Sequence, residues 1–178
     1  SDPNGNNVLA DIPGSDAKAG YVMAGAHLDS WVAADGAADN GAGSAVVMEA
    51  ARILAALKVK PKRTIRFALW SGEEQGLYGS ANYIERHFAS RPANPDPVKA
   101  RLSYDFKLGQ YPIEKKADYN LLAAYFNMDN GGGKFRGIHA EGNFAAVPIL
   151  QEWLSPFASM GASTVVASPP GGTDHEFM

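Results

Sequence analysis

The sequence predicts an α/β fold with a mostly parallel, mixed central sheet and helices on both faces. Short apolar runs rich in β-branched and aromatic residues alternate with longer segments whose apolar residues recur at helical spacing. Polar and acidic residues follow directly after several of the apolar runs. Hydrophobic residues make up 46% of the 178 residues, which is enough to build a buried core.

The predicted strands are short apolar runs bounded by polar or turn-forming residues. Five segments fit this description: residues 8–12, 21–28, 64–70, 121–128 and 163–167. Strands that alternate with helices usually pair in parallel, because the helix carries the chain back to the starting edge of the sheet. The order strand, helix, strand, helix therefore predicts a largely parallel sheet.

The predicted helices cover residues 41–58, 77–88 and 145–160. In the first of them, Val46, Ile53 and Leu57 recur at helical spacing, and Pro61 with the basic residues around it marks the end. In the last, apolar residues from Ile149 to Phe157 share one side. These amphipathic patterns place one face of each helix against the sheet.

Composition excludes several classes of function. The formal charge of −3 and the absence of a basic excess argue against nucleic acid and anionic membrane as partners. The chain has no cysteine, which excludes thiolate zinc ligands, a cysteine nucleophile and disulfides. No apolar run approaches the roughly 20 residues of a membrane helix, so we expect no membrane insertion. Oligomeric state and compartment stay open on composition alone.

We expect one globular domain over residues 1–178, incomplete at both ends. Ser1 in place of methionine indicates a processed or excised chain. Residues 91–120 turn polar and contain several prolines. A segment of this length without clear periodicity is expected to be an insertion or a lid, and a plain surface insertion is an equally good interpretation.

Acidic side chains cluster at the points where predicted strands end. Ligands bind at the carboxyl ends of strands in open α/β sheets, so these positions are candidates for a site. Each residue alone has a simple explanation as a helix cap, a solvated loop residue or a turn residue. Together they would repel one another unless a cation compensates, because burying one unpaired charge costs several kcal/mol. The candidates are His27, Asp29, Asp39, Glu73, Glu74 and Asp129.

Imidazole and carboxylate ligands suit zinc or a similar divalent ion, and a carboxylate that bridges two ions would make the site dinuclear. Competing chemistries fit less well. No serine lies in a Gly-x-Ser-x-Gly turn, and the glycines at 41 and 43 lack the lysine of a phosphate-binding loop.

Five motifs occur in order: Gly-Ala-His-Leu-Asp-Ser at 25–30, Asp-Asn-Gly-Ala-Gly at 39–43, Trp-Ser-Gly-Glu-Glu-Gln-Gly-Leu at 70–77, Asn-Met-Asp at 127–129 and Gly-Gly-Thr-Asp-His-Glu-Phe at 171–177. With them the chain resembles the zinc aminopeptidases of the bacterial leucyl aminopeptidase type, a family that also includes glutamate carboxypeptidase and its plasma relatives. The resemblance spans nearly the whole chain and implies the zinc-dependent exopeptidase fold.

The resemblance implies that His27 and Asp129 bind one zinc ion, that Asp39 bridges two ions, and that Glu74 binds the second. In the family a further histidine in a Tyr-His-Thr-like motif completes the second site. That motif would lie beyond Met178, so we expect two zinc ions in the full-length protein and an incomplete second site in this chain. His87 and His139 lie outside every motif.

The resemblance also implies the catalytic residues. Glu73 would be the general base, which takes a proton from zinc-activated water and returns it to the leaving amine. Asp29 would accept the second ring proton of His27 and so fix the tautomer and orientation of the imidazole. Candidates for the substrate pocket are Gly172, Thr173, Asp174 and His175; Asp174 there looks structural.

The implied activity is that of a metal-dependent exopeptidase that hydrolyses terminal peptide bonds of a peptide substrate, with an aminopeptidase as the first choice. A carboxypeptidase or dipeptidase of the same family is the close alternative, because His-Leu-Asp-Ser-Trp at 27–31 also resembles the plasma glutamate carboxypeptidase branch. A non-catalytic receptor-like binding domain and a glutaminyl cyclase relative are alternatives of other classes. The resemblance favours a secreted or periplasmic location.

Overall fold

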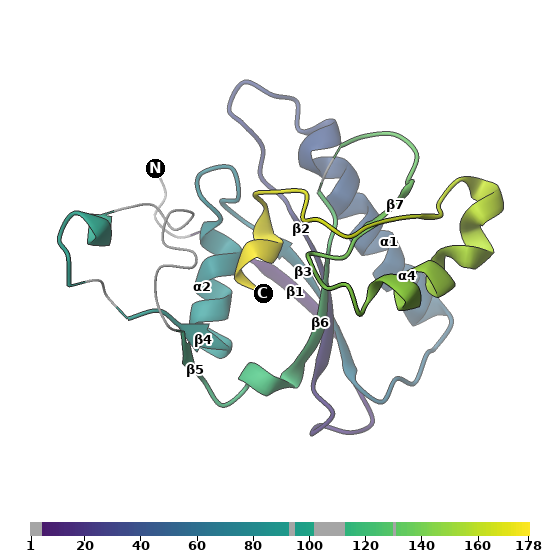
Figure 1. Cartoon of the computed structure of the whole chain (residues 1–178), viewed down its shortest axis with the longest axis horizontal. Helices are drawn as coiled ribbons and strands as arrows, with labels where there is room; N and C mark the ends of the chain where they lie inside the picture. The colour runs from purple at the N-terminus through teal and green to yellow at the C-terminus, as the bar shows by residue number, and fades with distance from the viewer. Residues whose placement is uncertain (1–4, 93–94, 102–112, 130) are drawn as a thin grey trace. The chain divides into compact units, whose positions relative to one another are not determined.

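A four-stranded mixed sheet forms the centre of the fold. The computed structural model describes residues 5–92, 95–101, 113–129 and 131–178. The strands lie in the order β1 (Val8–Ile12), β3 (Thr64–Trp70), β2 (Tyr21–His27) and β6 (Leu122–Asn127) (Figure 1). Strand β2 runs parallel to both neighbours, and β1 is antiparallel to β3. The predicted mixed, mostly parallel sheet is therefore confirmed, and its strands match the predicted segments.

The two main helices pack against opposite faces of this sheet, as side-chain alternation along β2 shows. Met23 is buried in a cluster with Ile84 of helix α2 (Tyr78–His87). Ala26 belongs to a second cluster with Val47 of helix α1 (Gly43–Ala56). Because neighbouring residues of a strand point to opposite faces, the two clusters lie on opposite sides of the sheet. Helices on both faces were predicted, and this prediction is confirmed.

Parallel pairing brings the ends of three strands to one edge. In register, His27 pairs with Trp70 and Gly25 pairs with Asn127, so β2, β3 and β6 finish at nearly the same level. The loops that follow these strands contain the predicted acidic residues. An irregular helical turn, η1 (Ala37–Ala42), connects the loop after β2 to helix α1.

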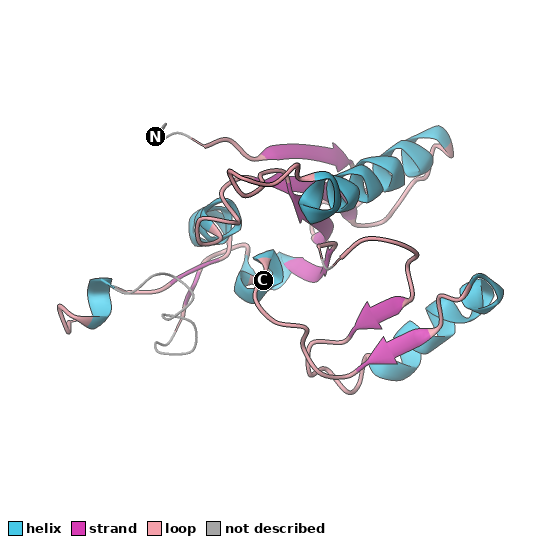
Figure 2. Ribbon diagram, turned by 90° about the horizontal axis from the view of Figure 1, so that it is seen from above, coloured by secondary structure: helices cyan, strands magenta, loops and turns pink. Residues whose placement is uncertain are grey.

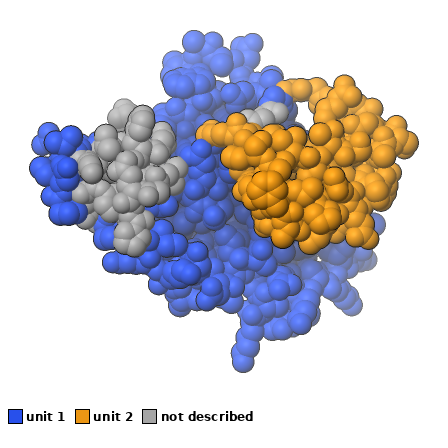
Figure 3. All heavy atoms as spheres, viewed as in Figure 1, with its two compact units in different colours: residues 1–131, 173–178 blue, residues 132–172 orange. Residues whose placement is uncertain are grey.

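The chain divides into two compact units, coloured blue and orange in Figure 3: residues 1–131 with 173–178, and residues 132–172. Besides the elements above, the first unit contains short elements: β4 (Ala89–Ser90), η2 (Lys99–Arg101), β5 (Glu114–Lys115), η3 (Tyr119–Leu121) and η5 (Asp174–Phe177). The predicted insertion or lid at 91–120 lies partly outside the described residues, and its role stays a prediction, as does the single domain over residues 1–178.

The second unit contains a small parallel sheet of β7 (Gly137–His139) and β8 (Thr164–Val166), whose arrows lie side by side near α4 in Figure 2. The predicted last strand is therefore present but pairs with β7. Helix α4 (Val147–Leu154) ends earlier than predicted, and a 3₁₀ turn, η4 (Ser155–Met160), continues it. Pro156 explains the change, because proline has no N–H to continue α-helical bonding. Among the described residues, no helix combines the length and apolar character needed to cross a bilayer.

Candidate metal centre

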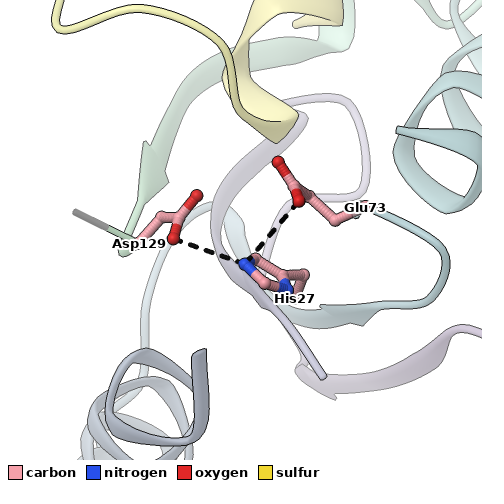
Figure 4. A group of neighbouring side chains, drawn as sticks. All are labelled: His27, Glu73 and Asp129. Carbon is pink, nitrogen blue, oxygen red and sulfur yellow. Dashed lines mark hydrogen bonds and ion pairs between the residues drawn. The ribbon is translucent and has the colours of Figure 1, made fainter. Parts of the chain in front are cut away.

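His27 is the centre of the site. It is the last residue of β2, and its side chain is only 1% exposed because the strand is covered on both faces. Its Nε2 atom lies 3.1 Å from Asp39 Oδ1, 3.3 Å from Asp129 Oδ1 and 3.9 Å from Glu73 Oε2. Figure 4 shows this ring nitrogen facing the carboxylates of Glu73 and Asp129. One imidazole nitrogen therefore meets carboxylates from three separate loops.

The carboxylates form two groups that share His27. One group combines His27 with Glu73 and Asp129, and the other combines it with Asp39 and Glu74. Within each group the potential ligand atoms lie within 4.8 Å of one another. Asp39 follows β2, Glu73 and Glu74 follow β3, and Asp129 follows β6, so the strand ends bring them together. The expected gathering of these residues is what the structure shows.

Asp29 contacts His27 through its backbone carbonyl and the Glu73–Glu74 turn through its carboxylate, whereas the resemblance implied a contact between the carboxylate and His27. Its carboxylate accepts the backbone N–H groups of Glu73 at 3.1 Å and Glu74 at 3.2 Å. His27 Nδ1 lies 3.0 Å from the Asp29 backbone carbonyl and 3.6 Å from the carboxylate. The nearest acceptor for the second ring proton is thus the carbonyl, because the carboxylate is engaged by the turn after β3.

Asn40 and Ser44 hold the backbone around His27. Asn40 is buried; its amide donates to the Met128 carbonyl at 2.9 Å, and its Oδ1 accepts the Gly43 N–H at the start of α1. A Cβ atom at position 43 would lie 2.1 Å from Asn40 Oδ1, which explains the glycine there. Ser44 donates to the His27 carbonyl at 2.8 Å. Apolar periodicity does not predict these contacts; the Asp-Asn-Gly-Ala-Gly motif is their only signal in the sequence.

The pKa values show an excess of negative charge. Burial lowers the pKa of His27, but the neighbouring carboxylates, led by Asp129, outweigh it and raise this pKa to about 9. Burial, reinforced by nearby acids, raises the pKa of Glu73 to about 7. The pKa of Glu74 is also raised, by burial and then by Asp39. Clustered acids with raised pKa values need a cation if all are to be ionised near neutral pH.

A divalent cation fits this donor set. Glu74 Oε1 is buried without a hydrogen-bond partner, so one carboxylate oxygen is available to a ligand. The cluster offers one imidazole nitrogen and several carboxylate oxygens, the ligand types that zinc accepts in proteins. The residues therefore fit zinc both in chemistry and in their excess of negative charge.

The metal-free protein is expected to lose stability as pH rises from about 4 to about 9, because several groups at the site hold protons more tightly when folded. Burial raises the pKa of Asp174 from 3.8 to about 6, and the pKa values of Glu73 and His27 also exceed their ordinary values. Such a group stabilises the fold below its unfolded pKa, and the effect disappears as pH passes its folded pKa. Urea unfolding with a chelator present at about pH 5, 7 and 9 measures the trend.

Excess zinc provides the control for this prediction. Metal ligands bind zinc as they lose protons, so the stabilisation by zinc should grow with pH while the metal-free protein weakens. The pKa of Asp129 is shifted in the opposite direction, mainly because hydrogen bonds from His27 and Thr173 outweigh burial, but this shift acts only in acid. Constant or rising stability of the chelator-treated protein over this range would contradict the prediction.

The predicted substrate-pocket residues occupy different places. Thr173 and Asp174 are fully buried: Thr173 Oγ1 accepts a hydrogen bond from Asn127 at 3.1 Å, and Asp174 accepts one from Ser80 of α2. Their side chains therefore face the interior, and the structural role expected for Asp174 agrees with this position. His175 follows at the start of η5, and Gly172 ends the second unit. A pocket role for these four residues stays a prediction.

The remaining histidines lie apart from the metal groups. His87 is exposed at the end of α2, and His139 is in β7 of the second unit, where its Nδ1 lies 2.8 Å from the Ser168 carbonyl. The metal groups found among the described residues contain neither of them.

The fold and the site define an α/β protein with a cluster suited to divalent cations at the carboxyl edge of its parallel strands. The profile of peptidase family M28 matches residues 7–177. The chain therefore belongs to peptidase family M28.

The chain is 40% identical to human Carboxypeptidase Q over 178 residues, which cover 99% of this chain and 31% of that protein. It is 44% identical to an Aminopeptidase of Pseudomonas aeruginosa over 84 residues, or 47% of this chain and 15% of that protein. This chain thus spans at most about a third of the length of these curated relatives.

Solved structures show the same fold. A Peptidase M28 precursor from Shewanella amazonensis superposes with a TM-score of 0.69 at 28% identity, covering 96% of this chain and 32% of that chain. BSAP, a zinc aminopeptidase from Bacillus subtilis, gives a TM-score of 0.64 at 24% identity over 96% of this chain and 36% of that chain. At that lower identity the second likeness supports the fold alone.

Proposed function

We propose that the protein containing this chain is a zinc-dependent exopeptidase that hydrolyses terminal peptide bonds. The observation that carries the proposal is the placement of His27 Nε2 within 3.3 Å of carboxylate oxygens of both Asp39 and Asp129. Membership of peptidase family M28 supports it. The complete set of acids argues against a receptor-like domain without a metal site.

Two zinc ions would be held at this edge of the sheet. His27 and Asp129 would bind the first, Asp39 would bridge both, and Glu74, with its buried free oxygen, would bind the second. Asp39 is 61% exposed, so its side chain lies on the solvent side of the group. A further histidine outside this chain is proposed to complete the second site.

Zinc, when bound, lowers the pKa of water and polarises a carbonyl group. Glu73 supplies the proton transfer: it takes the proton of the attacking water and delivers it to the leaving amine. Its side chain is 11% exposed and lies beside His27 without being its nearest carboxylate. Asp29 holds the Glu73 backbone N–H and thereby keeps the base next to the ligands.

The relatives support two candidates for the peptide terminus that is attacked. The aminopeptidase relative supports attack at the N-terminal bond, which we propose first. The similarity to Carboxypeptidase Q favours a carboxypeptidase or dipeptidase as the second candidate. Either activity would use the same metal groups of this chain, so substrates with blocked termini are needed to distinguish the two candidates.

The full-length protein is expected to release free amino acids from a short peptide whose C-terminus is amidated, and to leave the N-acetylated peptide intact. An aminopeptidase needs a free N-terminus, whereas a carboxypeptidase would show the opposite preference. Amino-acid release is measured by chromatography before and after treatment with a chelator. Activity should disappear with the chelator and return when zinc is added, because the ligands are preserved.

A peptide with N-terminal glutamine serves as the control for the cyclase alternative. Release of glutamine supports the exopeptidase, and loss of ammonia with ring closure would support the glutaminyl cyclase alternative. A protein that binds zinc but neither hydrolyses nor cyclises these peptides would contradict the proposed function.

A further inference from the structure

A row of side-chain hydrogen bonds runs from the core to the proposed zinc ligand Asp129. Trp70, the fully buried last residue of β3, donates its indole N–H to the Tyr125 hydroxyl at 2.8 Å. Tyr125 donates to Asn127 Oδ1 at 2.6 Å. The Asn127 amide donates to Thr173 Oγ1 at 3.1 Å. Thr173 in turn helps to lower the pKa of Asp129 by hydrogen bonding to its ionised carboxylate.

The direction of every bond in this row is fixed by its two ends. An indole N–H can only donate, and an ionised carboxylate can only accept. The Tyr125 oxygen accepts from Trp70 and donates its single proton to Asn127 Oδ1. The Asn127 amide must then present its NH₂ group to Thr173, whose own proton is left for Asp129. Each hydroxyl therefore has one orientation that satisfies both of its neighbours.

Gly25 shows that the fold keeps space for this row. It lies in β2, two residues before His27, on the same face of the sheet. A Cβ atom there would lie 2.4 Å from the Tyr125 hydroxyl and 2.7 Å from Trp70 Nε1. These distances are far below van der Waals contact, so any side chain at position 25 would separate the indole from the hydroxyl.

We propose that Tyr125 is a positioning residue for the metal centre: through Asn127 and Thr173 it fixes the orientation of the Asp129 carboxylate toward His27. The inference rests on the proposed function, because it takes Asp129 as a zinc ligand. Tyr125 packs against the core cluster that contains Met23 and Trp70. The packed core thus holds one end of the row, and Asp129 occupies the other.

Tyr125→Phe in the full-length protein tests the proposal, because phenylalanine keeps the ring and removes only the hydroxyl. Partners of this kind around a metal ligand typically change metal affinity by about 10- to 100-fold, and we expect a loss of about tenfold from this more distant position. Zinc affinity is measured by competition with a chromophoric chelator. Tyr21→Phe is the matched control, since Tyr21 packs against the same cluster outside the row.

A double substitution separates positioning from a general structural role. Thr173→Val removes the last hydroxyl of the row and should lower zinc affinity at least as much as Tyr125→Phe. If Tyr125 acts through Thr173, adding Tyr125→Phe to Thr173→Val causes no further loss of affinity. Independent, multiplying losses, or a Tyr125→Phe affinity equal to that of the Tyr21→Phe control, would overturn the proposal.

Chelator competition keeps this test separate from the proposed activity. A parent protein that binds zinc tightly and hydrolyses no peptide contradicts the exopeptidase, while a tenfold effect of Tyr125→Phe on its zinc affinity still supports positioning. Conversely, an active enzyme whose zinc affinity is unchanged by Tyr125→Phe contradicts only the positioning role. Failure to bind zinc in the parent protein would overturn both.

Discussion

Replacing Glu73 by glutamine in the full-length protein is expected to lower kcat by about 10²- to 10⁴-fold, the usual contribution of a general base, while the zinc content stays unchanged. Glutamine has nearly the same size and keeps the packing of a side chain that is only 11% exposed. It cannot take a proton from water. Steady-state kinetics and elemental analysis of the same preparation measure the two quantities.

Zinc content decides between two possible roles of Glu73, because its carboxylate also belongs to a potential metal group with His27 and Asp129. A direct ligand would lose zinc when it is replaced, whereas a base would not. Glu74→Gln is the comparison: it changes the adjacent residue, which is proposed to bind the second ion, and should lower the zinc content. Loss of zinc from Glu73→Gln, or substantial remaining turnover with zinc bound, would rule out the base.

Glu73→Ala is also expected to abolish turnover while the protein keeps its zinc, because alanine has no group that can take the proton from water. The alanine variant also leaves space beside the proposed zinc ligands. Added formate, a small carboxylate, should then restore part of the activity, whereas the glutamine variant should not respond.

The positions of the ligands could be predicted because parallel strands end at one edge. His27, Glu73 and Asp129 are far apart in sequence, yet each lies at or just after the end of a different strand of the sheet. The short apolar runs identified the strands, and the helical pattern between them favoured parallel pairing. Given those two inferences, the strand ends and their acidic residues had to meet.

Contacts that depend on the register of two segments or on backbone groups could not be predicted from the sequence. Asn40 binds the Met128 carbonyl 88 residues away, and Ser80 binds Asp174 across 94 residues. Such pairs depend on how two segments are shifted along each other, and side-chain periodicity does not specify that shift. The contacts of the Asp29 carboxylate with Glu73 and Glu74 were not predicted for a different reason: its partners are backbone N–H groups, which are present at every non-proline residue.

A proline marks the early end of α4, which the apolar pattern alone does not predict. Pro156 lies inside the segment predicted as one helix, and the α-helix ends at Leu154. Pro148 does not break it, because it lies in the first turn, where no intrahelical N–H bond is lost. The position of each proline within the helix therefore explains both outcomes.

His27→Ala is expected to lower zinc affinity by more than about 100-fold, beyond the range typical of residues that only support a ligand, and to abolish zinc-dependent hydrolysis. His27 is the only nitrogen donor in either metal group among the described residues, and both groups share it. Without the imidazole the donors left in these two groups are carboxylate oxygens, which suit magnesium, calcium or manganese better than zinc. Chelator competition with zinc and manganese measures both the loss of affinity and the change in preference.

His87→Ala is the matched control, because His87 is exposed at the far end of α2, roughly 14 Å along the helix from its first residue. Zinc affinity should not change in this variant. His27→Ala should also remove the contribution that the raised pKa of His27 makes to the pH dependence of the metal-free protein between 6.5 and about 9. If His27→Ala kept its zinc affinity, the carboxylates alone would hold the ion, and the imidazole would have to be a structural partner of Asp39 and Asp129.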